Sequence, residues 1–175
     1  MGSNPPLPEF GRPVEVSRIG PSGLSLAIEA DAAERERLAR RLGLNELRRL
    51  HADVALQPRG AGIALTATWT AEVVQDCVVT LDPVVSELGD TFELAYGPAD
   101  APTTAAEIEL DLEVADPPEP IEGGRIDVGE AVVEQLALAI DPYPRKPGVA
   151  FEAPADEAEK KDNPFAALRG LKGHN

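Results

Sequence analysis

The chain has 175 residues, a net charge of −15, one cysteine and only 4% aromatic residues, which fits one globular domain with an aliphatic core. A single cysteine excludes an intramolecular disulfide and fits a reducing compartment. The sequence has neither a run of about 18 apolar residues nor the pattern of a signal peptide. We therefore expect a cytoplasmic protein with no membrane partner.

The charge is unevenly distributed along the chain. Residues 61–141 hold 18 acidic residues and one basic residue, Arg125, whereas residues 1–60 and 142–175 each have a net charge of +1. An acidic segment repels nucleic acid phosphate and attracts basic proteins. Any contact with RNA is therefore expected through the flanking segments.

The first third of the chain combines strand and helix patterns. Residues 1–13 are proline-rich and predict a flexible arm. Residues 31–50 predict two short helices joined at Gly43, because Asp31 is a suitable N-cap and Glu34 completes a capping box. Alternating apolar residues predict strands at 14–19, 22–30 and 52–57.

The strongest pattern is an alternation over residues 63–81, in which Gln75 is the one polar residue on the apolar side. Such a strand has one face in the core and one in solvent. It is too long to stay straight in a small domain, so a bend or bulge is expected at Gln75. The alternation places Cys77 inward and Thr80 outward. Shorter alternations predict strands at 91–96 and 108–114.

The clearest helix pattern lies within residues 125–148. Asp127 is a suitable N-cap, and Glu130 stands at the position that reaches back to it. An apolar stripe repeats every four residues, at Val128, Val132, Leu136 and Ile140. Beyond one globular domain at 14–148, we expect an acidic flexible linker at 149–162 and a short helical motif and tail at 163–175.

These elements predict an α+β fold: a bent antiparallel β-sheet or partly open barrel, with one main amphipathic helix packed on it. A short helical segment in the N-terminal third is expected to cover one end of the sheet.

Catalytic chemistry has little support in the sequence. Cys77 lies among acidic residues and far in sequence from His51 and His174, so a buried structural thiol is favoured over a nucleophile. The histidines and the cysteine lack zinc-ligand spacing, and the chain contains neither a nucleophile elbow nor a phosphate-binding loop. We expect no catalytic residue, metal, cofactor or small-molecule substrate.

Three basic or amphipathic groups are candidates for binding RNA or a protein partner. Each has a structural alternative: a solvated helix face, a helix-exit turn, and a segment that packs back on the domain. The first group is Arg35, Arg37, Arg40, Arg41, Arg48 and Arg49, the second is Tyr143, Arg145 and Lys146, and the third is Phe165, Leu168 and Lys172 with Leu171.

Four stretches taken together resemble the YceD-like family of large ribosomal RNA subunit accumulation proteins. They are ADAAERERLARRLGL, QDCVVTLDPV, IDVGEAVVEQLALAIDPYPRKPG and NPFAALRGLKG, and their order and spacing resemble the family over most of the chain, from about residue 14 to 172. The motif residues with an expected structural role are Cys77, Thr80, Asp127, Gly129, Glu130 and Glu134. Many members have a second cysteine at the position of Thr80, so this chain lacks the thiol pair of a metal or redox site.

The resemblance implies a non-enzymatic factor needed for normal levels of 23S ribosomal RNA, whose gene often neighbours that of a large-subunit ribosomal protein. Our hypothesis is a bipartite adaptor. The acidic side of the sheet would bind a large-subunit ribosomal protein, and the basic groups would contact precursor ribosomal RNA. The alternatives are an acidic protein-interaction module without RNA contact, and a thiol-dependent or RNA-processing enzyme.

Overall fold

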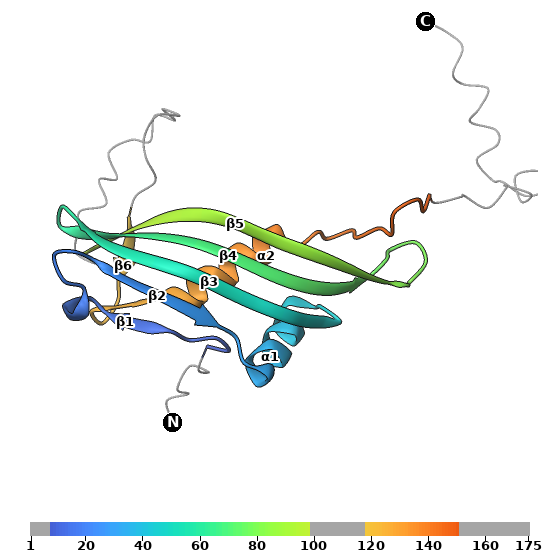
Figure 1. Cartoon of the computed structure of the whole chain (residues 1–175), viewed down its shortest axis with the longest axis horizontal. Coiled ribbons are helices and arrows are strands. Elements are labelled where there is room, and N and C mark those ends of the chain that lie inside the picture. Colours follow the sequence, from blue (N-terminus) through green and yellow to red (C-terminus); the bar gives the residue numbers. More distant parts are fainter. Residues whose placement is uncertain (1–7, 99–117, 151–175) are drawn as a thin grey trace, which may run out of the picture.

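The computed structural model describes residues 8–98 and 118–150, and its elements follow one another along the chain as Figure 1 shows. They are β1 (Pro13–Glu15), a 3-10 turn (Val16–Arg18), β2 (Leu24–Glu29), α1 (Ala32–Leu42), β3 (Glu46–Arg59), β4 (Gly62–Asp76), β5 (Pro83–Pro98), β6 (Glu119–Ile121), β7 (Arg125–Asp127) and α2 (Val128–Ala139).

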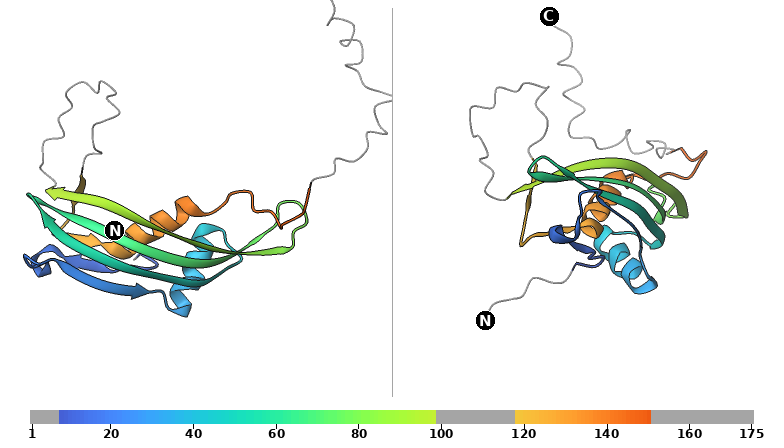
Figure 2. Two further views of the ribbon diagram at one scale, coloured as in Figure 1. Left: turned by 45° about the horizontal axis from the view of Figure 1, so that its top comes forward. Right: turned by 60° about the vertical axis from the view of Figure 1, so that its left-hand side comes forward.

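The main sheet has five strands in the order β2-β3-β4-β5-β6. The first four strands are antiparallel neighbours, whereas the short β6 runs parallel to the end of β5. A second sheet pairs β1 with β7. The main sheet bends along its length, and both helices and β1 lie on its concave side (Figure 2). The predicted α+β class with an open, bent sheet is confirmed, and its parallel edge strand makes the sheet mixed.

The apolar alternation decides which face the helices cover. In one cross-strand row, Leu24, Leu56, Leu65 and Leu94 all face inward, and the same register places Trp69 beneath the middle of the sheet. The predicted stripe of α2 meets this face, because Val128, Val132 and Leu136 are fully buried. Burial of these aliphatic side chains is the main stabilising contribution to the domain.

The second predicted helix, over residues 44–50, is wrong. α1 ends at Leu42 and is capped by Gly43 in the left-handed conformation, and β3 begins at Glu46. Leu47 and Leu50 are both buried because a β-bulge between Leu47 and Arg49 inserts an extra residue. Because of the bulge, two inward-facing leucines are three residues apart instead of two. A spacing of three residues between apolar side chains is also typical of a helix.

The predicted strand 63–81 is too long, and its bend is misplaced. β4 ends at Asp76, so Cys77 and Thr80 lie in a turn and not on a strand. The bulge is in β3, and Gln75 is accommodated because its Nε2 donates to the carbonyl of Asp141 at 2.9 Å.

The remaining boundaries also shift. β5 begins at Pro83 instead of residue 91, since Gly89-Asp90 resembles a turn but lies within the strand. The predicted first strand shortens to β1 followed by the 3-10 turn, and the helix expected within 125–148 occupies Val128–Ala139. Phe10, which the sequence places in the flexible arm, is fully buried. The predicted strand 108–114 and the motif 163–175 lie outside the described residues.

Candidate binding surfaces

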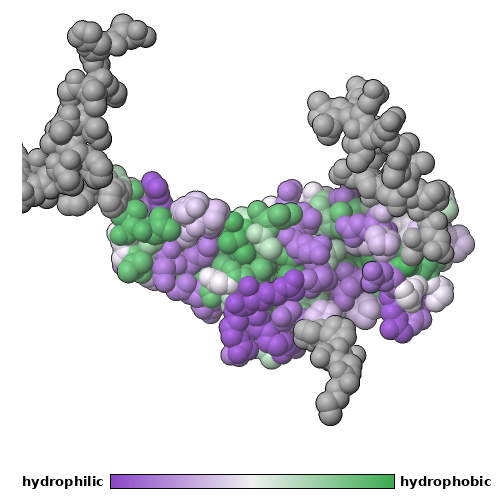
Figure 3. Space-filling model, turned by 180° about the vertical axis from the view of Figure 1, so that it is seen from behind, coloured by the Kyte–Doolittle hydropathy of each residue, from purple (hydrophilic) through white to green (hydrophobic). Residues whose placement is uncertain are grey.

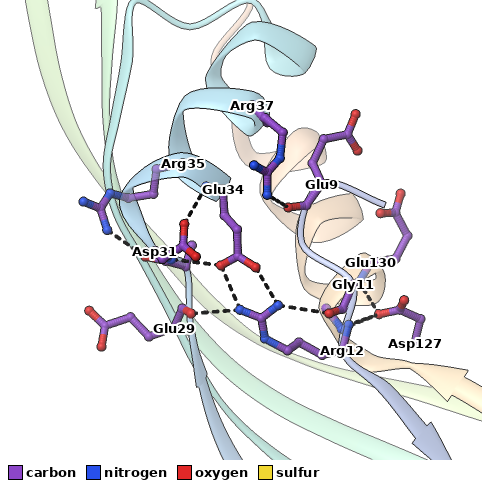
Figure 4. Close-up of polar contacts among 12 residues, drawn as sticks. Glu9, Gly11, Arg12, Glu29, Asp31, Glu34, Arg35, Arg37, Asp127 and Glu130 are labelled. Carbon is purple, nitrogen blue, oxygen red and sulfur yellow. Dashed lines mark hydrogen bonds and ion pairs between the residues drawn. The ribbon is translucent and has the colours of Figure 1, made fainter. Parts of the chain in front are cut away.

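Arg12 holds the N-terminal ends of both helices in place (Figure 4). Its guanidinium donates to both carboxylate oxygens of Glu34, at 2.7 and 2.8 Å, and to the carbonyl of Glu29. Its backbone N–H donates to Asp127 Oδ1 at 2.8 Å. Hydrogen bonds from the Arg12 side chain lower the pKa of the buried Glu34 carboxyl, more strongly than burial raises it. No motif marks Arg12 in the sequence.

Most arginines of α1 are bonded to other parts of the protein. Arg35 and Arg37 donate to the carbonyls of Ala30 and Glu9, at 2.7 and 3.2 Å, as Figure 4 shows. Arg41 pairs with Glu9 at 3.1 Å and also with Glu130. Arg40 forms only an exposed pair with Glu36 at 3.8 Å, a kind of contact that contributes little stability.

Arg48 and Arg49 do not share the helical surface expected for them. They lie on β3, where Arg48 pairs with Glu46 and Glu72, at 2.9 and 3.1 Å, and Arg49 approaches Glu87 at 3.5 Å. The six arginines of the first predicted group are therefore divided between a helix and a strand, and their charge is partly balanced by neighbouring carboxylates.

The motif at the start of α2 has a structural role in this fold. Asp127 caps the helix by accepting from the N–H groups of Gly129 and Glu130, at 3.0 and 3.2 Å. Gly129 is buried against the N-terminal chain, where a Cβ atom would lie 1.9 Å from the carbonyl oxygen of Phe10. Glu130 reaches Arg41 instead of the N-cap, and Glu134 is exposed, with its pKa raised mainly by partial desolvation.

Two motifs far apart in sequence meet at one end of the sheet. The turn at residues 77–82 connects β4 to β5, and the loop at residues 141–147 follows α2. Val78 N–H donates to the carbonyl of Pro144 at 2.9 Å, Lys146 N–H donates to Cys77 Sγ at 3.4 Å, and Lys146 Nζ lies 3.2 Å from Asp82. The loop residues Tyr143 and Arg145 are exposed beside this contact.

Cys77 is buried, as the sequence predicts, but the pKa of its thiol is lower than that of an ordinary cysteine. A hydrogen bond from the Thr80 side chain, helped by backbone N–H groups of Lys146, Thr80 and Val79, lowers the pKa of Cys77 to about 6. These donors favour the thiolate more than burial disfavours it. The sulfur acts here as an acceptor that joins the turn to the loop. Among the described residues, no three His, Cys, Asp or Glu side chains form a metal-binding group.

The turn and the loop also carry exposed apolar side chains. Val78, Leu81 and Tyr143 are 45%, 75% and 70% exposed, and we call these three residues the end patch. In Figure 3 apolar surface gathers at the left-hand end of the molecule, beside the point where the chain continues toward residues 151–175. Exposed apolar side chains that gather at one place make it a candidate interaction site.

The convex side of the sheet is a broad polar surface, which we call the outer face. Apart from His51, its central rows hold small or acidic side chains, and no residue in these rows is fully buried: Ser25, Ala27, Glu29, His51, Asp53, Ala55, Thr66, Thr68, Thr70, Gly89, Thr91 and Glu93. A shallow open groove crosses β2, β3 and β4 on this face. Within the described part of the chain, Glu29, Asp53 and Glu93 have no arginine or lysine partner.

The fold and these surfaces define a small α+β protein that presents an acidic sheet face and an apolar end to solvent. The chain belongs to the YceD family of large ribosomal RNA subunit accumulation proteins, whose family model matches residues 65–172. The matched range contains β4 from Leu65 onward, β5, α2 and the two motifs that meet at the end of the sheet, but not α1. No curated protein and no solved structure matches the chain significantly.

Four of the residues predicted to bind a partner, Phe165, Leu168, Leu171 and Lys172, lie outside the described residues. Within residues 8–98 and 118–150, no helix is long and apolar enough to cross a membrane.

Proposed function

We propose that this protein supports the accumulation of large-subunit ribosomal RNA by binding and without catalysis, in the cytoplasm, and that its outer face binds a basic large-subunit ribosomal protein. The role in ribosomal RNA accumulation is proposed from the family to which the chain belongs. The observation that carries the choice of partner is the charge of the outer face, where Glu29, Asp53 and Glu93 are exposed without arginine or lysine partners among the described residues.

The shape of the outer face supports the same partner. Side chains in its central rows are mostly Ser, Ala and Thr, so the backbone of a bound segment could approach the sheet closely. Of the three arginines on β3, Arg48 and Arg49 lie toward one end and are paired with Glu46, Glu72 and Glu87, and Arg59 is the last residue at the other end. The centre of the face is therefore acidic, which favours a basic protein and disfavours RNA phosphate.

A direct RNA contact is a separate proposal with a different location. Arg37, Arg41 and Arg48 already bond protein groups. Arg145 is exposed and has no ion pair within the described part of the chain. We propose the RNA contact there, and crosslinking of the full chain to precursor RNA, mapped to residues 141–147, would distinguish an adaptor from a protein-only module.

The protein-binding proposal is tested by affinity purification of the full chain from cell extract at about 100 and 500 mM salt. At low salt, the double variant Asp53→Lys, Glu93→Lys should recover about tenfold less ribosomal protein than the wild type. The reason is that these substitutions reverse the charge that attracts a basic partner to the outer face. The matched control is Glu36→Lys, Glu122→Lys, which makes the same charge change away from the outer face. Equal recovery with both double variants would refute this binding face.

A further inference from the structure

The end patch is held in place before any ligand is bound. Within the turn, Cys77 N–H donates to Asp82 O at 2.8 Å, and Leu81 N–H donates to Cys77 O at 2.9 Å. The bond from Val78 N–H to Pro144 O fixes the turn against the loop after α2. Because these hydrogen bonds already order the end patch, little conformational entropy is lost when another segment binds to it. This small entropy loss favours binding.

Leu81 is the most unusual residue of the patch. Its φ of 61° lies in the left-handed region, and no other non-glycine residue in the described ranges has a positive φ. This backbone conformation costs about 1 kcal/mol or more for a residue with a Cβ atom. The fold thus holds a strained leucine at 75% exposure, where its side chain contributes little to the core. Strain of this kind is typical of functional sites.

The chain itself continues from the patch. The described residues after α2 run through the loop to residue 150, and Val149 N–H donates back to Lys146 O at 3.2 Å. About twelve residues, 151–162, separate this point from NPFAALRGLK at residues 163–172. Fully extended, they span roughly 40 Å, so the segment can reach the patch, and a tether of this length gives an effective concentration in the millimolar range.

The segment 163–172 complements the patch in polarity and charge. At helical spacing, Phe165, Leu168 and Leu171 share one side. The segment has no acidic residue and carries Arg169 and Lys172.

Two carboxylates near the patch suit these cations, and they outnumber Arg145, which lies beside the patch and forms no ion pair within the described residues. Asp76 accepts from Asn45 Nδ2 at 2.7 Å, and Asp141 accepts from Tyr143 N–H at 2.8 Å. Neither carboxylate forms an ion pair within residues 8–98 and 118–150.

We propose that residues 163–172 dock on the end patch of the same chain, with Phe165, Leu168 and Leu171 covering Val78, Leu81 and Tyr143. Docking buries the exposed leucine and closes the chain after α2 into a loop. A partner that recognises either surface then competes with the tail, so the docked segment acts as an internal competitor at this end of the sheet.

The test uses amide NMR spectra of the full-length protein. Leu168→Asp should shift the amide signals of residues 78–82, Tyr143, Arg145 and Lys146, whereas Ala166→Asp, which places the same charge on the opposite side of a helix, should leave them unchanged. In the reverse direction, Leu81→Asp should shift the signals of residues 163–172. The control is Leu138→Asp, which changes an equally exposed leucine on α2.

Two results would overturn the proposal. Patch signals that stay at their wild-type positions in Leu168→Asp would show that the tail does not cover the patch. A concentration-dependent dimer in sedimentation that is lost in Leu168→Asp would assign the patch to the tail of a second copy. Wild-type patch signals that do not change on tenfold dilution, together with the reciprocal shifts, are the result we expect.

Discussion

Arg12 joins three segments that are distant in sequence: the N-terminal chain, the start of α1 and the cap of α2. It also stacks over Phe10, with its guanidinium carbon 4.3 Å from the ring centroid. The capping box of Asp31 and Glu34 is predictable from spacing, and both of its hydrogen bonds are present. The arginine that neutralises Glu34 is not predictable, because the contact depends on a chain separation of 22 residues.

The pair of Arg12 and Glu34 predicts how stability depends on pH. The folded pKa of Glu34 is lowered, so its contribution is complete above the unfolded glutamate value of about 4.3 and is lost as the pH falls through the folded pKa. Arg12→Met should lower the free energy of unfolding at pH 7 by about 2 to 3 kcal/mol, because it leaves a buried carboxylate unpaired.

The measurement is urea denaturation followed by fluorescence of the buried Trp69. The difference between Arg12→Met and the wild type should shrink below about pH 4, where Glu34 becomes protonated in the variant. Arg18→Met, at an exposed position, is the control and should behave as the wild type. A difference that stays constant down to pH 2.5 would contradict the role of this ion pair.

Thr80 sets the titration of Cys77, because its side chain provides the largest of the effects that lower the thiol pKa to about 6. Thr80→Val removes the hydroxyl and should raise this pKa toward the ordinary value of about 8.5. Thiolate absorbance near 240 nm, followed from pH 4 to pH 10, measures the change in a chain with a single cysteine. Thr70→Val on the outer face is the control, and an unchanged titration in Thr80→Val would contradict the assignment.

At the scale of elements, sequence patterns predict faces better than boundaries. The inward rows of the sheet and the stripe of α2 follow from periodicity alone. The start of β3 does not, because its bulge gives Leu47 and Leu50 a spacing that two different structures share. The meeting of the 77–82 turn with the 141–147 loop also escapes prediction, since it depends on where β4 and α2 end relative to each other.

The close contact between the start of α2 and the N-terminal chain gives a prediction at the scale of elements. Alanine usually stabilises a helix relative to glycine by about 1 kcal/mol. At Gly129 the sign should reverse, because the new methyl group would lie 1.9 Å from Phe10 O and force the N-terminal chain away from the helix. We expect Gly129→Ala to destabilise the protein by about 3 kcal/mol.

Thermal unfolding of Gly129→Ala tests this prediction against Gly20→Ala. A Cβ atom at Gly20 meets no atom within 4 Å, and its φ is not in the left-handed region, so that variant should be neutral or slightly stabilised. A Gly129→Ala protein as stable as the wild type would mean that α2 is not seated on the backbone of residues 10–12.

For the molecule as a whole, composition predicts electrostatics more directly than it predicts fold. The net charge of −15 arises mainly from the acidic middle of the chain. Part of this negative charge lies on the outer face, where carboxylates have no arginine or lysine partner among the described residues. Most of the ion pairs in the described residues are at the surface, where each contributes little. We therefore expect repulsion among like charges to dominate the response of the fold to salt.

This balance predicts that salt stabilises the protein at neutral pH. Raising NaCl from about 20 to 500 mM at pH 7 shortens the screening length from roughly 20 Å to about 4 Å and should raise the Tm by several degrees, because it weakens repulsion more than it weakens surface ion pairs. Near the isoelectric point of 4.4, where net repulsion vanishes, the same addition should leave the Tm unchanged or lower it. Scanning calorimetry at both pH values measures the two effects. A decrease in Tm with salt at pH 7 would show that the ion pairs around Arg12, Arg41 and Arg48 outweigh the net charge.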